Sequence, residues 1–355
     1  ADAEGLEVIL DRARVIGREQ MFLIGIRLLT GLIEPEHAGS AYALVAETLI
    51  EKLHAAVEAD FETRHGRVPG GKSAVLAMGR LGSREMTATS DLDLIIIYDA
   101  DEDAKQSDGK RPLAVPQYFA RLTQRLISAI SAPTAEGKLY EVDMRLRPSG
   151  NQGPVATHFK SFENYQLNDA WTWEHMALTR ARVISGPPEL ASAIGDAIRT
   201  TLTLPRDAAK LASDVREMRE RIWAEKGTEN IWEMKQVRGG LIDLEFTAQY
   251  LQLRYAAEHP EVLDTNTLEA LARCREAGLI DAQDCQALTA AGHLLNTLAH
   301  LLRICFEGGS DVTTAPDGLK SLLAAACGEP DVPRVELKLA DHQAAVTALY
   351  DKLVT

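Results

Sequence analysis

The chain contains 355 residues, 46% of them hydrophobic, which is long enough for two or three domains and a sizeable core. Its 38 Lys and Arg residues against 52 Asp and Glu residues give a formal net charge of −14, which argues against nucleic acid and anionic membranes as partners but leaves room for a local basic pocket that binds one small anion. No apolar run approaches the roughly 18 residues of a membrane span, and residues 1–4 lack the positive charges of a leader, so we expect a soluble, cytoplasmic protein.

The cysteines and the first residues give two further expectations. The four cysteines lie in the last quarter of the chain, at wide spacings and without the paired histidines of a zinc site, so we expect them to be reduced and partly buried on helices. They are Cys274, Cys285, Cys305 and Cys327. The lack of an initiator Met, and an opening that reads as the middle of a helix, indicate a fragment of a longer chain.

The chain begins with a helical region and continues into a predicted sheet. Residues 6–66 follow a largely helical pattern, clearest over residues 40–65, which contain no Gly or Pro. A turn cluster at residues 68–71 precedes a buried strand at residues 73–79 and, after a Gly-containing loop, a second strand at residues 93–98.

The next elements are a polar loop at residues 99–111, an amphipathic helix at residues 117–130 and a third strand at residues 139–146. No further strand is expected after residue 168. The remainder is predicted to be helical, with Gly or Pro between several of the helices. These helices are expected at residues 170–184, 189–200, 208–223, 241–257, 267–276, 282–306, 319–327 and 337–354.

This order of elements predicts a compact α/β unit between two helical segments, the second of which is similar to a bundle. We place an N-terminal helical segment at residues 1–66, a catalytic domain at residues 67–203 and a C-terminal helical bundle at residues 204–355.

Two acidic residues stand at the start of the second strand. Asp91 and Asp93 are two positions apart, so their carboxylates point to the same side of the strand. Like charges this close repel one another unless a cation lies between them. Magnesium is the natural cation, because it prefers oxygen ligands and usually takes one or two protein carboxylates together with phosphate oxygens.

The third strand has the same character. Its charged residues alternate with apolar ones, which places Glu141, Asp143, Arg145 and Arg147 on one face. If this strand neighbours the second one, Asp143 completes a cluster of three carboxylates, and the two arginines become donors to phosphate oxygens.

The loop between the first two strands suits a nucleotide triphosphate. Gly79 and Gly82 would let backbone N–H groups approach the phosphates, and Ser83 and Ser90 offer hydroxyl groups. Taken alone, an Asp-x-Asp pair is more often a solvated strand edge, and an alternating charged strand is often only half exposed. The combination of strand, glycine loop, Asp-x-Asp strand, helix and carboxylate strand is far more specific.

This combination resembles the nucleotidyltransferase superfamily of the DNA polymerase β type. The matching residues are Met78-Gly79-Arg80, ten loop residues at 81–90, and Asp91-Leu92-Asp93. The resemblance implies an α+β fold with a mixed sheet, flanking helices and a C-terminal helical bundle domain. Arg80 departs from the pattern, since the superfamily usually has Gly or Ser there.

Several motifs in order indicate a narrower family. They are Gly79-Arg80-Leu81-Gly82 with Glu85 and Ser90-Asp91-Leu92-Asp93-Leu94, then residues 140–150 (YEVDMRLRPSG), Trp171-Thr172-Trp173-Glu174-His175, Arg180-Ala181-Arg182, and residues 238–246 (RGGLIDLEF). Together they resemble the glutamine synthetase adenylyltransferase family, from about residue 73 to residue 255.

The resemblance implies an adenylyltransferase. Full-length members of that family carry two catalytic units, one that attaches AMP from ATP to a tyrosine of glutamine synthetase and one that removes it by phosphorolysis, and this chain is similar to one unit. Residues 146–150 and 170–175 resemble the C-terminal, adenylylating half. The adenylyl-removing half and a non-catalytic nucleotide-binding regulatory module remain the alternatives, whereas a small-molecule nucleotidyltransferase would lack the motif at residues 240–246.

The resemblance also implies the ligands and their residues. Two Mg²⁺ ions would be held by Asp91, Asp93 and Asp143 together with the phosphates of ATP, the substrate. Glutamine synthetase would be the protein partner, and a PII-type signal protein and glutamine would regulate the full-length enzyme. The residues expected to bind the nucleotide are Gly79, Arg80, Gly82, Ser83, Ser90, Arg145, Arg147, Lys235 and Arg238.

Two other motifs have a structural as well as a functional interpretation. Glycines before a helix with acids in its first turn also satisfy ordinary capping, although Asp243 or Glu245 could face a cleft. The segment Trp171 to His175 is interpreted mainly as packing, and nothing in the sequence pairs His175.

Overall fold

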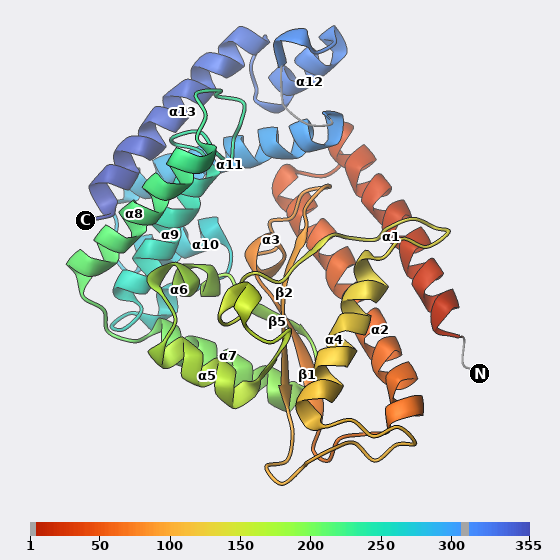
Figure 1. Ribbon diagram of the computed structural model, residues 1–355. Helices are drawn as coiled ribbons and strands as arrows, with labels where there is room; N and C mark the ends of the chain where they lie inside the picture. The colour runs from red at the N-terminus through yellow and green to blue at the C-terminus, as the bar shows by residue number, and fades with distance from the viewer. Residues whose placement is uncertain (1–4, 307–311) are drawn as a thin grey trace.

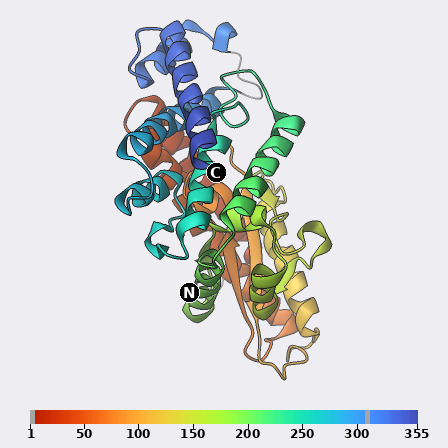
Figure 2. The ribbon, with the colours of Figure 1, turned by 90° about the vertical axis from the view of Figure 1, so that its left-hand side faces the viewer.

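The fold is α+β, as the sequence predicts. The computed structural model describes residues 5–306 and 312–355, so residues 1–4, expected not to form a leader, lie outside the described part. A five-stranded mixed sheet lies among helices, and the later helices form an arc beside it (Figure 1). Figure 2 shows the C-terminal helices at one end of the molecule and the strands toward the other.

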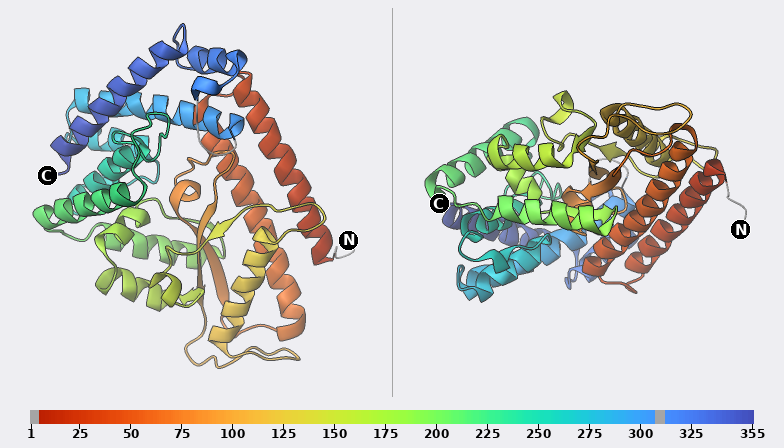
Figure 3. Two further views of the ribbon diagram at one scale, coloured as in Figure 1. Left: turned by 45° about the horizontal axis from the view of Figure 1, so that its top comes forward. Right: turned by 90° about the horizontal axis from the view of Figure 1, so that it is seen from below.

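Two long antiparallel helices form the N-terminal region. The helices α1 (Leu6–Leu29) and α2 (Pro35–His65) lie side by side, as the right-hand view of Figure 3 shows. The break between them falls where Gly31 has a φ of +70° and where Pro35 can only begin a helix. Helix α2 packs on α4 (Val115–Ser131), on the sheet and on a C-terminal helix, so this region is part of the same core.

One central strand organises the sheet. The strand order is β3-β2-β1-β5, and β4 also pairs with β2. Strand β1 is antiparallel to β2 and β5, whereas β3 and β4 run parallel to β2. The strands are β1 (Lys72–Ala77), β2 (Leu92–Asp99), β3 (Val142–Asp143), β4 (Ala156–His158) and β5 (Arg182–Ser185).

Both faces of the sheet are buried. Leu94 and Ile96 of β2 join the core that includes α2 and α4, whereas Ile95 and Ile97 join the core that includes the later helices. Because side chains alternate along a strand, Asp93 belongs to the second of these faces. The strand is therefore an apolar support with an acid at its start.

Two predicted elements and one predicted absence differ from the structure. The third strand covers only Val142–Asp143 of the expected residues 139–146, because the chain turns at Met144. The helix expected at residues 170–184 ends at Leu178, and β5 follows it, so the prediction of no strand after residue 168 is wrong. Strand β5 forms because it pairs with β1, and the local sequence pattern does not reveal this long-range pairing.

The segment between β3 and α6 also holds a strand and a helix that were not predicted. These are β4 and α5 (Phe159–Asn168). A one-turn helix, α3 (Gly79–Gly82), occupies the start of the glycine loop, the name used below for residues 79–90.

Most of the later described helices pack around α9. Helices α6, α8, α10, α11 and α13 contact it, whereas α7 packs on α5 and β5, and α12 rests on α11 and α13. Their bounds are α6 (Thr172–Leu178), α7 (Pro188–Leu202), α8 (Ala208–Lys226), α9 (Leu241–Tyr255), α10 (Thr267–Glu276), α11 (Ala282–Cys305), α12 (Asp317–Ala326) and α13 (Val332–Leu353). None of the helices in the described ranges combines the length and apolarity needed to cross a bilayer.

The cysteines are free, as predicted. Cys274, Cys285 and Cys327 are buried, and Cys305 at the end of α11 is exposed. Burial raises the pKa of the Cys274 thiol to about 12. This thiol is therefore protonated and acts as a small apolar core group.

A buried arginine fastens the N-terminal helices to the sheet region. Arg14 on α1 is fully buried, and its guanidinium donates to the backbone carbonyls of Gly137, Ala129 and Ala132 at 2.9, 2.9 and 2.6 Å. These carbonyls lie at the end of α4 and in the loop after it, where backbone acceptors lack helical partners.

We expect the Arg14→Ala variant to lose about 3 kcal/mol of unfolding free energy, because several buried carbonyls would lose their donors together. The matched control is Arg18→Ala, one turn along α1, whose ion pair with Glu136 at 2.6 Å is half exposed. That change should cost less than about 1 kcal/mol. Urea unfolding followed by circular dichroism measures both, and equal losses would contradict the role given to Arg14.

Candidate active site

Backbone pairing brings the predicted carboxylates together. Strands β2 and β3 are parallel neighbours, with Leu92 opposite Val142 and Asp93 opposite Asp143. Asp91 lies just before β2 and is exposed. The expected adjacency of the two carboxylate strands is therefore present, although β3 is only two residues long.

Asp93 sits in an unfavourable electrostatic position. Burial, followed by the negative charges of Asp91 and Asp143, raises the pKa of the Asp93 carboxyl to about 6. The cations Arg180 and Lys235 act in the opposite direction but do not compensate. The ionised form of Asp93 would thus gain from a further positive charge.

Asp143 is in the opposite situation. Hydrogen bonds from Arg145 hold the pKa of the Asp143 carboxyl below its usual value. The backbone N–H of Arg145 donates to Asp143 at 2.8 Å, Nε donates at 2.7 Å, and Nη2 lies 2.5 Å away. Because the chain turns after Asp143, Arg145 folds back on this carboxylate and does not continue the strand face.

The donor set matches the chemistry of a magnesium site. Carboxylate oxygens are the ligands that Mg²⁺ prefers, and after burial the negative charges of Asp91 and Asp143 contribute to the raised pKa of Asp93. Within residues 5–306 and 312–355, no three His, Cys, Asp or Glu side chains already stand in an arrangement that would hold a metal ion. The Asp143 carboxylate is engaged by Arg145, whose Nε donates to it.

The glycines of the loop are required by close packing. Gly79 has a φ of +52°, and a Cβ built on it would lie 2.1 Å from Oδ2 of Asp93. A Cβ on Gly82 would lie 1.9 Å from the carbonyl oxygen of Arg180. A side chain at Gly79 would displace the Asp93 carboxylate, and a side chain at Gly82 would displace the backbone at Arg180.

The two serines of the loop make internal hydrogen bonds. The Ser83 hydroxyl accepts from Nη2 of Arg180 at 2.8 Å and is buried. The Ser90 hydroxyl accepts from the backbone N–H of Thr87 at 2.9 Å. Both hydroxyls shape the loop, and phosphate binding by them stays a prediction.

A cavity of about 430 Å³ is lined by Asp91, whereas Asp93 and Asp143 are not among its lining residues. It brings four of the predicted residues together, namely Arg80, Ser90, Asp91 and Lys235. Glu141 of the predicted third strand also lines it. The other lining residues were not predicted as site residues, and they are Thr87, Thr89, Trp232, Glu233, Met234, Leu241, Ala299, Leu302, Arg303 and Phe306.

Arg303 is the most important of the lining residues that were not predicted, because it is a cation. It adds a cation from α11, more than 200 residues after Asp93 in the chain. Its sequence context is an ordinary amphipathic helix, so no local signal marked it. Lys235, in contrast, was found because it precedes the glycine pair at Gly239 and Gly240.

Two predicted phosphate ligands have other partners here. Arg238 pairs with Glu220 at 2.5 Å and lies over the ring of Trp223, outside the cavity. Arg147 is buried and donates to the carbonyl oxygen of Met144 at 2.7 Å. In this structure Arg238 ties the segment before α9 to α8, and Arg147 holds the turn after β3.

The aromatic segment was only partly interpreted correctly. Trp171 is 68% exposed, so packing does not describe it. Glu174 caps α6 by accepting from the backbone N–H of Trp171 at 2.9 Å. His175 has a partner, since its Nε2 lies 2.9 Å from the carbonyl oxygen of Gln166.

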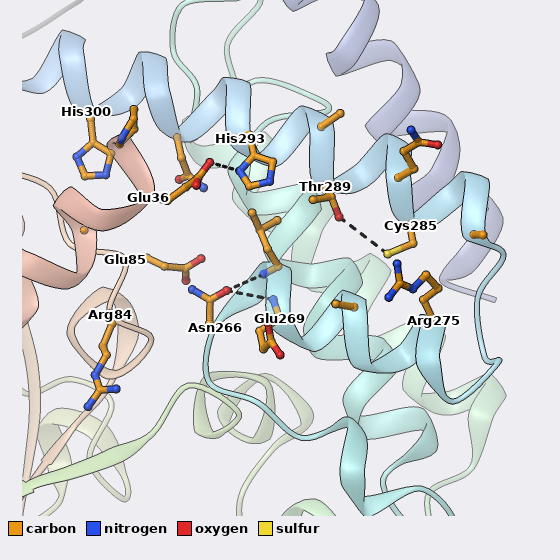
Figure 4. Close-up of a pocket in the computed structure, with 18 residues that line it drawn as sticks. Glu36, Arg84, Glu85, Asn266, Glu269, Arg275, Cys285, Thr289, His293 and His300 are labelled. Carbon is orange, nitrogen blue, oxygen red and sulfur yellow. Dashed lines mark hydrogen bonds and ion pairs between the residues drawn. The ribbon is translucent and has the colours of Figure 1, made fainter. Parts of the chain in front are cut away.

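A larger cavity of about 800 Å³ lies on the other side of the glycine loop, between α2, α10 and α11 (Figure 4). Its lining includes Glu36, Glu85, Asn266 and His293, and it contains none of the predicted carboxylates or nucleotide-binding residues. The smaller cavity is the candidate active site, because chemistry is assigned by reacting groups and not by volume.

Two family models match consecutive parts of the chain. Residues 1–196 match glutamate-ammonia ligase adenylyltransferase, and residues 209–354 match GlnD PII-uridylyltransferase. The sheet with its carboxylate strands is thus of the nucleotidyltransferase class. The first match covers more than half of the chain, and the protein belongs to the glutamate-ammonia ligase adenylyltransferase family.

Curated relatives agree with this assignment. The chain is 49% identical over 354 residues to the bifunctional glutamine synthetase adenylyltransferase/adenylyl-removing enzyme of Rhodopseudomonas palustris strain TIE-1, covering 100% of this chain and 36% of the relative. It is 50% identical over 353 residues to the enzyme of the same name from Brucella suis biovar 1 strain 1330, covering 99% and 36%. The chain therefore spans about a third of the length of these relatives.

The raised pKa of Asp93 predicts a pH-dependent stability. The folded state binds the Asp93 proton more tightly than the unfolded state does, so this contribution is complete at low pH and is lost as the pH rises through about 6. An Asn side chain cannot ionise. In EDTA, Asp93→Asn should therefore be more stable than the wild type at alkaline pH, by about 1–3 kcal/mol, and this advantage should vanish below about pH 4.

Denaturant unfolding at a series of pH values in EDTA measures this difference. Asp196→Asn on the exposed side of α7 is the control and should show no such trend. An Asp93→Asn advantage that is constant with pH would show that the carboxyl is not perturbed as described.

Proposed function

We propose that this chain transfers AMP from ATP to a tyrosine of glutamine synthetase and releases pyrophosphate. The observation that carries this proposal is the register of β2 and β3, which sets Asp93 opposite Asp143, two residues from Asp91, and Asp91 lines a cavity together with Arg80, Lys235 and Arg303. The named activity of the relatives supports it. The residues 146–150 and 170–175, with their resemblance to the adenylylating half, support the direction.

The residues divide into two groups with separate tasks. Asp91, Asp93 and Asp143 would hold magnesium, two ions in this proposal, and the metal would supply positive charge for the triphosphate and the leaving group. Arg80 on the glycine loop and Lys235 before α9 both line the cavity. They would bind the phosphate oxygens together with the backbone of the glycine loop. Arg303 joins them as a third cation.

Arg145 has a place in this scheme because it already binds Asp143. When nucleotide enters, its guanidinium would exchange the carboxylate for a phosphate oxygen, which it can bind in the same two-pronged way. Loss of that partner would raise the pKa of Asp143. Asp143 would then be a better base for the proton of the attacking phenol.

The transfer itself is a displacement at the α-phosphorus. The tyrosyl oxygen forms the new bond to phosphorus, the bond to the pyrophosphate oxygen breaks, and the phenol proton passes to Asp143. The chain's residues orient the reactants and hold the charges, and the scheme needs no serine or cysteine nucleophile.

The remaining parts of the proposal concern organisation. Residues 67–203 are proposed as the catalytic domain, with helical segments at residues 1–66 and 204–355. The full-length protein is proposed to act in the cytoplasm, under control of a PII-type protein and glutamine.

Incubation with Mg²⁺, α-labelled ATP and glutamine synthetase tests both substrate and direction. Label on a tyrosine supports the proposal. Loss of AMP from adenylylated glutamine synthetase as ADP, in the presence of phosphate, would instead identify the adenylyl-removing half. Nucleotide binding without transfer in either direction would identify a regulatory module.

Asp91→Ala or Asp93→Ala should lower the AMP transfer rate by about 10³-fold or more, because each removes a metal ligand worth several kcal/mol in the transition state. Circular dichroism should show that both variants remain folded. Asp99→Ala, at the other end of β2, is the control and should keep its activity. Full activity in either carboxylate variant would exclude these residues as metal ligands.

A further inference from the structure

Arg180, two residues before β5, and Arg182, the first residue of β5, hold the glycine loop in place. Arg182 donates from Nε to the carbonyl oxygen of Gly82 at 3.2 Å and from Nη2 to that of Leu81 at 3.1 Å. Arg180 donates from Nη2 to the Ser83 hydroxyl at 2.8 Å. These contacts join the loop to a segment about 100 residues away in the chain.

Arg180 is in turn held by a carboxylate from α9. Its Nη1 lies 2.8 Å from Oε2 of Glu245, while its Nη2 lies 3.1 Å from Oε2 of Glu85. The hydroxyl of Thr267, which begins α10, donates to the same Glu85 oxygen at 3.1 Å. All these charged groups are buried or nearly so, with 8% of the Arg180 side chain and 18% of the Glu245 side chain exposed.

The surroundings of Glu245 reach the active-site cavity. Burial alone would raise the pKa of Glu245. The positive charges of Arg180, Arg80 and Lys235 outweigh burial and hold the pKa of this carboxyl below its usual value. Two of these cations, Arg80 and Lys235, line the cavity beside Asp91.

Glu245 is thus the common anion of three cations that come from separate segments. Without it, their mutual repulsion in a partly buried site would favour moving them apart. Arg80 shows this balance, since the charge of Arg180 lowers the pKa of its guanidinium while the charge of Glu245 raises it, after the larger effect of burial.

The neighbouring acid on α9 has a different role. Asp243 and Glu245 are two positions apart on a helix, so they point to different sides. Asp243 forms a buried ion pair with Arg219 of α8 and accepts from the backbone N–H of Gly239. It anchors α9 within the helical region and does not contact the glycine loop, so it provides a matched comparison.

We propose that Glu245 is a positioning residue for nucleotide binding, which acts through Arg180 to fix the glycine loop, and Arg80 within it, beside Asp91 and Asp93. The ion pair that Glu245 makes is with Arg180, and Arg180 in turn donates to Ser83 of the loop. Glu85 completes the arrangement from the side of the larger cavity, into which its side chain points (Figure 4).

The first test measures the loop directly and does not depend on the proposed function. In Glu245→Gln, hydrogen exchange of backbone amides in residues 79–90 should become about tenfold faster or more, because Arg180 loses its charged partner. Asp243→Asn should speed exchange at the start of α9 and in α8 but leave the glycine loop unchanged. Equal exchange of the loop in Glu245→Gln and the wild type would overturn the inference.

The second test is kinetic and rests on the proposed function. Glu245→Gln should lower kcat/KM for ATP by about 100-fold, as expected for reactive groups displaced by about 1 Å, while KM for glutamine synthetase stays the same. Asp243→Asn should keep kcat/KM for ATP at a temperature where it is folded, although its unfolding temperature falls. A wild type that transfers no AMP would sink the proposed function, and the exchange result would still decide the role of Glu245.

A second variant covers the case in which Glu245→Gln does not fold. Arg180→Lys keeps the positive charge near Glu245, but one ammonium group cannot bind Glu245, Glu85 and Ser83 in the same geometry. It should fold and still show the faster exchange of the glycine loop. Wild-type exchange and wild-type kcat/KM for ATP in this variant would show that the ion-pair network does not position the loop.

Discussion

The organising constraint of this molecule is the crowding of negative charge at the start of β2. Asp93 is two residues from Asp91 and opposite Asp143 of β3, and burial followed by these two negative charges raises the pKa of its carboxyl to about 6. The repulsion among these carboxylates destabilises the ionised, metal-free protein, and a bound cation would relieve it. The nearby cations that oppose this charge, Arg180 and Lys235, come from distant parts of the chain.

The local part of this site could be predicted from sequence, and the long-range part could not. Asp91, Asp93 and the two glycines are within 15 residues of one another, so spacing and strand periodicity were sufficient to find them. Arg303 has no such signal, because an arginine on an amphipathic helix is usually solvated. Its approach to the carboxylates depends on how α11 crosses α2, which no local pattern specifies.

The same distinction explains the errors in secondary structure. The long helices and the two buried strands, β1 and β2, were predicted because their periodicity extends over six or more residues. Strands β3, β4 and β5 are two to four residues long and exist because β2 and β1 offer them backbone partners. Arg145 was assigned to a strand face on alternation alone, whereas the turn after Asp143 folds it back onto that carboxylate.

The two matched regions, residues 1–196 and 209–354, follow one another in the chain and are packed against each other. Arg180 of the first region is neutralised by Glu245 of the second, α11 packs on α2, and the cavity takes Arg80 and Asp91 from one side and Lys235 and Arg303 from the other. Separating the two regions would expose Arg180 and leave it with one carboxylate partner, Glu85. It would also remove Lys235 and Arg303 from the cavity that Asp91 lines. The candidate active site therefore lies where the two regions meet, and a shift of α9 or α11 relative to the sheet would move Lys235 or Arg303 relative to Asp91.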